Sequence, residues 1–250
     1  MQRMSVVSCI MSILSLFLIM CVACRPEYES SLLDAKAQKA YNVLKFKVDN
    51  YRSKLVNELE SVVLKGPLLF NDQSYSLVLL QAEEDATKRS IAVTLGNDSK
   101  VIERLKEILN TLDLRKGKSS TSDVDIAGRI LKQLTDVTNL AVILFHKHLS
   151  KKNLIRIRNS LMIEVGSVSV LDDITSDLEQ FIQARVEVMS KIRSFIKTAA
   201  AKRGDKAVMI NCLKSLIDDT GELSKEILAR LVGNVFNIEN KLIDLFKWDS

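Results

Sequence analysis

Apolar side chains recur at steps of three and four residues along most of this chain, and few residues interrupt them. Only two prolines and eight glycines occur among 250 residues, so the chain favours long uninterrupted helices. The pattern runs from Tyr28 to Lys65, where Gly66 and Pro67 end it. One face of that helix would carry Leu33, Ala37, Ala40, Leu44, Val48, Tyr51, Leu55, Leu59 and Val62. The sequence therefore predicts an all-α fold; the nearest approach to strand alternation, 165–171, is short.

The same periodicity continues to the end of the chain, with short polar or glycine-containing breaks. Further helices are predicted over 73–95, 98–113, 122–149, 154–165, 172–203, 205–220 and 222–246. About seven to eight helices joined by short loops predict a single-domain antiparallel bundle over residues 28–250. Because residues 140–145 are wholly apolar, we expect the helix that contains them to be central.

The first 25 residues, MQRMSVVSCIMSILSLFLIMCVACR, differ from the rest. Arg3 precedes an apolar run from Val6 to Val22, and Ala23 then stands directly before Cys24. This pattern predicts a lipoprotein signal peptide over 1–23, lipidation of Cys24 and a short tether over 24–27. Cys21 is the alternative acceptor. An uncleaved membrane helix and ordinary secretion also remain open, since the run approaches the length that spans a bilayer.

Two residues outside this segment carry open structural roles. Cys212 would be the only other cysteine of the mature chain, so an internal disulfide is not expected; an apolar setting predicts a core residue, with a reactive thiol as the alternative. Trp248, near the end of the last helix, is interpreted either as a lid on the core or as an oligomer contact. The sequence does not decide between these two roles or give the oligomeric state.

No pattern indicates catalysis. His146 and His148 are two residues apart, so on a helix they cannot chelate one ion from the same face. The acidic pairs at 83–84, 172–173 and 218–219 diverge in the same way. Motifs of zinc proteases, α/β-hydrolases, P-loops and dinucleotide-binding proteins are absent from the sequence. We expect no enzyme activity, cofactor or metal, and the mild net charge of +5 does not indicate nucleic-acid binding.

One cluster of positive charge stands out between the predicted fourth and fifth helices. It contains no acidic residue and consists of Lys147, Lys151, Lys152, Arg156 and Arg158. Such a patch can bind an anionic host surface, an acidic protein patch or a glycosaminoglycan. The alternative interpretation is a solvated turn beside a buried helix.

The chain resembles the helical surface lipoproteins of Borrelia spirochaetes, above all the complement regulator-acquiring proteins and their paralogues. The resemblance is carried by the signal ending in Cys24, the absence of a disulfide framework and the succession of Lys-, Leu- and Ile-rich helices. The resemblance implies a lipid-anchored protein of the outer membrane at the cell surface. It also implies binding of host plasma proteins, factor H foremost and plasminogen or matrix proteins besides, for immune evasion. The competing hypothesis is a surface-coat or periplasmic structural lipoprotein without a host ligand.

Overall fold

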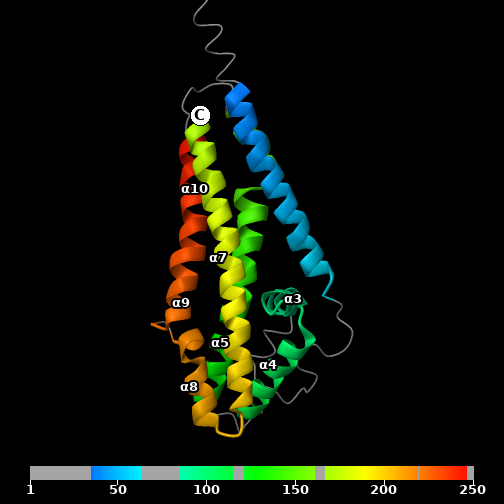
Figure 1. Ribbon diagram of the computed structural model, residues 1–250, viewed down its shortest axis with the longest axis vertical. Coiled ribbons are helices and arrows are strands. Elements are labelled where there is room, and N and C mark those ends of the chain that lie inside the picture. Colours follow the sequence, from blue (N-terminus) through cyan, green and yellow to red (C-terminus); the bar gives the residue numbers. More distant parts are fainter. Residues whose placement is uncertain (1–34, 63–84, 115–120, 161–166, 219, 247–250) are drawn as a thin grey trace, which may run out of the picture.

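The computed structural model describes residues 35–62, 85–114, 121–160, 167–218 and 220–246. Within these ranges every regular element is a helix, which confirms the all-α prediction (Figure 1). The predicted signal peptide, both candidate lipidation cysteines Cys21 and Cys24, the tether and Trp248 lie outside the described residues. No helix in the described ranges combines the length and apolar character needed to cross a membrane.

An N-terminal helix covers residues 35–60. The labelled elements that follow are α3 (Asp85–Thr94), α4 (Ser99–Thr111), α5 (Thr121–Ile143), the π-helical segment η1 (Leu144–His148), α6 (Lys151–Ser160), α7 (Ser167–Ala201), α8 (Lys206–Ile217), α9 (Glu222–Glu226), the π-helical segment η2 (Ile227–Val232) and α10 (Gly233–Phe246).

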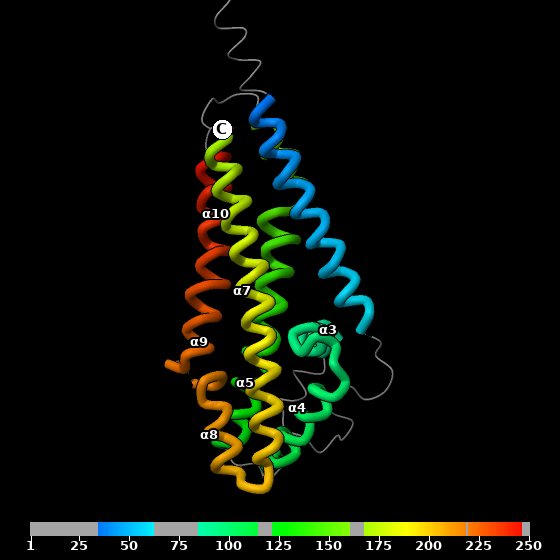
Figure 2. Tube along the Cα trace, viewed as in Figure 1, coloured from blue at the N-terminus to red at the C-terminus, as the bar shows by residue number. Residues whose placement is uncertain are grey.

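The long helix α7 runs the length of the bundle (Figures 1 and 2). It lies antiparallel to α5 and to the run α8–α10, while α3 crosses the bundle. The N-terminal helix runs in the same direction as α7, and pairs Lys47 with Glu179 and Tyr51 with Arg185. The starts of the N-terminal helix and of α7 and the end of α10 therefore meet at one end of the bundle (Figure 1).

One hydrophobic core joins the N-terminal helix to every labelled element. Its largest fully buried side chains include Phe145 and Phe181. The predicted stripe of the first helix faces this core, with Leu44 and Val48 completely buried. Within 140–145, which the sequence placed on a central helix, Ala141, Leu144 and Phe145 are fully buried, whereas Ile143 is 43% exposed. The outer side of α5 faces solvent there.

Capping residues fix several helix starts at the predicted positions. The Asp98 carboxylate accepts hydrogen bonds from the backbone N–H groups of Lys100 and Val101, and Asp205 accepts from Val208 N. Gly96, the residue after the helix predicted over 73–95, has φ +74°, a left-handed conformation that is common for glycine at a helix end.

The start of α7 differs from the prediction. The helix already includes Ser167, five residues before Asp172, and so contains most of the segment that resembled a strand. Leu171 is fully buried, and Val168 and Val170 pack against the core from half-buried positions. Branched residues locally prefer an extended backbone. Here the burial of these side chains outweighs that preference and stabilises the helix.

Candidate binding surface

The basic residues predicted from the sequence flank the break between η1 and α6: Lys147 precedes it and the other four follow it. The end of η1 exposes backbone carbonyls, and two side chains bind them. Arg52 of the N-terminal helix donates to the carbonyls of Phe145 and Leu149, and Asn153 Nδ2 donates to those of Lys147 and His148 at 3.0 and 2.9 Å. These bonds satisfy groups that the end of a helix leaves without partners. Ser150 Oγ accepts from Asn153 N at 3.2 Å and so caps the start of α6.

The structure places one side of α6 against the core and the other in solvent. Leu154 and Ile157 are buried, whereas Lys151, Lys152 and Arg158 are exposed. Ile155 is 60% exposed. Residues three and four apart are neighbours on a helix, so these three cations surround Ile155. We call the four exposed side chains Lys151, Lys152, Ile155 and Arg158 the α6 surface.

The other two residues of the predicted patch are engaged elsewhere. Lys147 Nζ lies 3.6 Å from Glu239 Oε1. The Arg156 guanidinium lies over the Phe246 ring at 4.1 Å and donates to the Phe246 carbonyl at 3.3 Å, so it holds α6 against the end of α10. The patch of five thus divides into two structural contacts and three cations that make no ion pair with any described residue.

Local helix energetics account for Arg158, which lies in the last turn where the helix dipole favours a cation, but not for the other two charges of the α6 surface. Lys151 and Lys152 lie in the first turn of α6, which contains no acidic residue. The positive end of the helix dipole disfavours cations there by about 0.3–1 kcal/mol each. A role in binding an anionic partner is consistent with positive charge at positions where it weakens the helix.

The two histidines do not form a site. His146 is exposed and His148 is buried, with its Nδ1 3.7 Å from Glu239 Oε1. Burial lowers the pKa of His148, and Glu239 opposes this effect. Among the described residues no group of histidine, cysteine and acidic side chains could hold a metal ion. Cys212 is a free, half-buried thiol that packs against the core.

Sequence reasoning missed a buried polar cluster around Arg185. This α7 side chain is 2% exposed, and Nη1 donates to the Tyr51 hydroxyl at 2.7 Å. Glu58 Oε2 and Thr138 Oγ1 each lie 3.5 Å from a guanidinium nitrogen. An arginine followed by Val186 on a long helix gives no signal of burial, because its partners are more than forty residues away along the chain.

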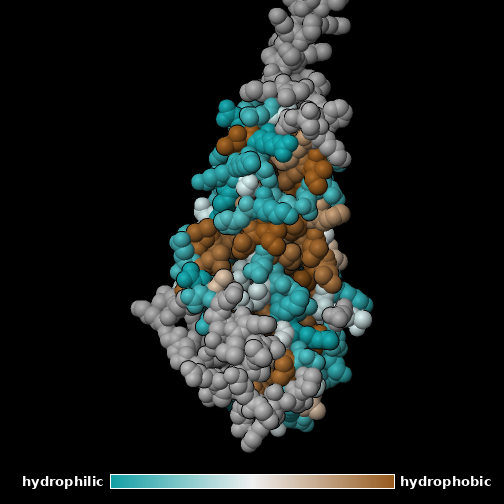
Figure 3. Space-filling view, turned by 180° about the vertical axis from the view of Figure 1, so that it is seen from behind, coloured by the Kyte–Doolittle hydropathy of each residue, from teal (hydrophilic) through white to brown (hydrophobic). Residues whose placement is uncertain are grey.

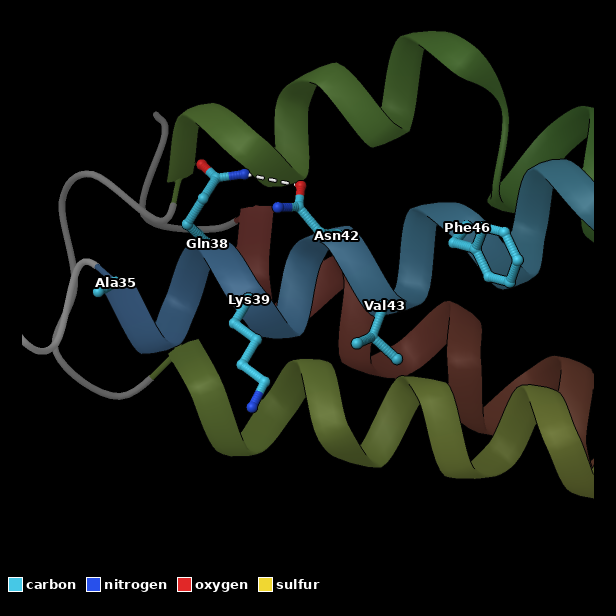
Figure 4. A pocket seen from close by; sticks show the side chains of 6 residues that line it. All are labelled: Ala35, Gln38, Lys39, Asn42, Val43 and Phe46. Carbon is cyan, nitrogen blue, oxygen red and sulfur yellow. Dashed lines mark hydrogen bonds between the residues drawn. The ribbon is translucent and has the colours of Figure 1, made fainter.

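Two exposed apolar regions were also not predicted. A hollow of about 480 Å³ follows the outer side of the N-terminal helix, where Val43 and Phe46 face outward (Figure 4). Gln38 donates to Asn42 beside it. The face seen from behind the view of Figure 1 carries a band of hydrophobic residues (Figure 3). Contiguous apolar surface is typical of interaction sites, but no described residue indicates an occupant for either region.

Comparison with known proteins identifies no family. No protein-family model matches the sequence, and no curated protein matches it significantly. Among solved structures, a crystal structure of the Borrelia spielmanii protein BSA64, described as orthologous to B. burgdorferi BBA64, aligns over 89% of this chain and 99% of its own, at 13% identity and a TM-score of 0.20. Values this low do not show a shared fold, and no functional inference is drawn from them.

Proposed function

We propose that this protein is a lipid-anchored surface lipoprotein that binds host plasma proteins, with complement regulator factor H as the first candidate, and that the α6 surface is its contact. The observation that supports the contact is the group of three exposed cations around an exposed isoleucine, none of which forms an ion pair with a described residue. The anchor rests on the Ala23-Cys24 signal, and the host ligand rests on the resemblance to the complement regulator-acquiring lipoproteins.

The composition of the α6 surface favours a protein partner over a purely electrostatic contact. Protein interfaces combine an apolar centre with a polar rim, and here Ile155 is the centre while Lys151, Lys152 and Arg158 form the rim. The complementary surface would carry carboxylates around an apolar pocket. Its charges would speed association and select the partner, and burial of Ile155 would contribute to affinity.

The α6 surface has a stable frame. Its buried side packs on the core through Leu154 and Ile157, and Arg156 joins it to α10. Because these contacts remain when the exposed side chains change, α6 can lose its charges without losing its position. Binding and folding can therefore be tested separately.

The test is a pull-down from plasma with the full-length lipidated chain on beads, followed by mass spectrometry. The binding variant replaces Lys151, Lys152 and Arg158 by serine. The matched control replaces Lys100, Lys197 and Lys202, which are equally exposed and make no ion pair within the described ranges. We expect the binding variant to lose about tenfold or more in affinity, equivalent to about 1.4 kcal/mol, and the control to retain the plasma protein.

Three outcomes would reject the proposal or part of it. Failure of the wild-type chain to retain any plasma protein at about 0.15 M salt would favour the coat or structural role. Equal loss in the two triple variants would mean that net charge matters and the α6 surface does not. The wild-type chain could instead bind vesicles rich in anionic lipid and retain no plasma protein. Loss of this vesicle binding in the binding variant alone would show that the α6 surface contacts a membrane. Protease shaving of intact cells tests surface exposure independently.

A further inference from the structure

The buried guanidinium of Arg185 forms a long ion pair with Glu58. Among the described residues its nearest carboxylate oxygen, Glu58 Oε2, is 3.5 Å away, and its Nε has no hydrogen-bond partner there. Its short contact is with the Tyr51 hydroxyl at 2.7 Å. Burial raises the pKa of Tyr51, so that hydroxyl is neutral. Since a buried charge is costly unless it is closely paired, the long 3.5 Å ion pair with Glu58 leaves the Arg185 charge only partly compensated among the described residues.

A pocket of about 270 Å³ adjoins Arg185 and brings further positive charge to it. The N-terminal helix contributes Lys54 and Glu58, and α7 contributes Arg193. Neither Lys54 nor Arg193 forms an ion pair with a described residue. Three cations thus line the pocket with one carboxylate, which already lies beside Arg185.

The turn after α3 leaves room for one of these cations. Gly96 has φ +74°, and a Cβ atom at this position would lie 2.4 Å from Arg193 Nη1. The absence of that Cβ lets the guanidinium lie against the turn at the pocket wall. Asn97 ties the same turn to the N-terminal helix, because its Nδ2 donates to the Glu58 carbonyl and to Ser61 Oγ, both at 3.1 Å.

We infer that this pocket binds a small oxyanion, namely a phosphate or sulfate group, which is either free or carried on a polysaccharide. Arg193 and Lys54 contact the group directly, since a guanidinium binds two oxygens through parallel N–H donors and an ammonium acts as a point charge. The field of Arg185 adds to the attraction from the pocket wall. The site lies on the N-terminal helix, the α3–α4 turn and α7, so it is independent of the α6 surface and of the proposed host ligand.

The experiment is isothermal titration of the full-length chain in mild detergent with three separate probes: inorganic phosphate, inorganic sulfate and a sulfated disaccharide. Arg193→Gln and Lys54→Gln remove one charge each from the pocket. The matched controls are Arg104→Gln and Lys197→Gln, which remove one charge each from exposed positions elsewhere. Circular dichroism and thermal melting confirm that each variant folds.

We expect the wild-type chain and both controls to bind at least one probe, and Arg193→Gln to bind it about tenfold or more weakly, as for the loss of a charge-assisted hydrogen bond. Lys54→Gln should weaken binding to a smaller extent, because its side chain is more exposed. Binding of the disaccharide alone identifies a polysaccharide as the source of the group. Absence of binding to all three probes overturns the inference, and so does binding that survives Arg193→Gln or falls equally in the controls.

Discussion

The contact between Tyr51 and Arg185 gives the sharpest test of how the N-terminal helix is held on the bundle. Tyr51→Phe removes the hydroxyl and keeps the ring, which stacks on Phe145 at a centroid distance of 5.0 Å. The lost bond is a charge-assisted contact of 2.7 Å to a side chain that is 2% exposed. A hydrogen bond to a charged group contributes about 1.5–3 kcal/mol. Because the other oxygens near Arg185 lie at 3.5 Å, we expect the full loss in the free energy of unfolding.

The assay is urea denaturation of the full-length chain in mild detergent, followed by far-ultraviolet circular dichroism. Tyr41→Phe is the matched control, because Tyr41 is also buried on the N-terminal helix but its hydroxyl bonds to no described residue. Its expected change is within about 0.5 kcal/mol. Equal losses in the two variants would refute the reasoning, since the cost would then belong to removal of any tyrosine hydroxyl.

A double-mutant cycle isolates the pair. Arg185→Met replaces the buried charge by an apolar side chain of similar length, a change that is often neutral or stabilising. Glu58 then remains half-buried and partly solvated. In the Arg185→Met background, Tyr51→Phe should cost less than about 0.5 kcal/mol, so the coupling energy should equal most of the single-mutant loss. Undiminished loss in that background would show that the hydroxyl acts through another partner.

Three further predictions concern other parts of the chain. Gly221→Ala should destabilise the fold by about 1–3 kcal/mol, because a Cβ there would lie 2.6 Å from the Ser215 carbonyl oxygen. A Cβ at Gly233 would meet no atom within 4 Å, so Gly233→Ala should stabilise α10 by about 0.5–1 kcal/mol. Thermal melts that rank the two variants in the opposite order would contradict this prediction. The pKa of His148 is lower in the folded state than in the unfolded state, so folding favours the neutral form. The stability of the wild type relative to His148→Gln should therefore fall as the pH drops below about 6.5. Parallel pH profiles of stability for the wild type and His148→Gln would contradict this prediction. Cys24→Ala should abolish acylation and cleavage of the signal peptide, whereas Cys21→Ala should not. Intact mass after membrane extraction measures both. Acylation that persists in Cys24→Ala would place the anchor at Cys21.

Within the described ranges, local signals in the sequence correctly predicted the all-α class and those helix ends at which one residue decides the conformation. The stripe containing Leu44 and Val48 is buried, Asp98 and Asp205 cap their helices, and Gly96 has a left-handed backbone. Each of these outcomes depends on side-chain spacing or on a residue's own backbone preference.

Features that depend on contacts between distant segments could not be predicted in the same way. The Tyr51–Arg185 contact joins residues 134 positions apart, and no periodicity reports such a pairing. Similarly, the basic cluster was identified from the sequence, but the sequence could not show which of its residues make structural contacts. Arg156, for example, contacts Phe246, which is 90 residues away along the chain. Long-range packing also extended α7 back to Ser167.

The α6 surface and the proposed lipid anchor are mechanically connected through the N-terminal helix. Arg52 on this helix binds the carbonyls that end η1, immediately before α6 begins. Arg156 places α6 beside Phe246, at the end of the bundle where residue 35 also lies (Figure 1). Eleven peptide units separate Cys24 from Ala35, and they span at most about 40 Å.

A lipid at Cys24 would therefore keep this end of the bundle near the membrane, and a plasma protein would have to approach the α6 surface from the side. Lengthening the segment between Cys24 and Ala35 should raise the capture of a large partner on intact cells while leaving the affinity of the detergent-solubilised chain unchanged. Capture on cells that does not respond to tether length would show that the partner does not bind at this end of the bundle.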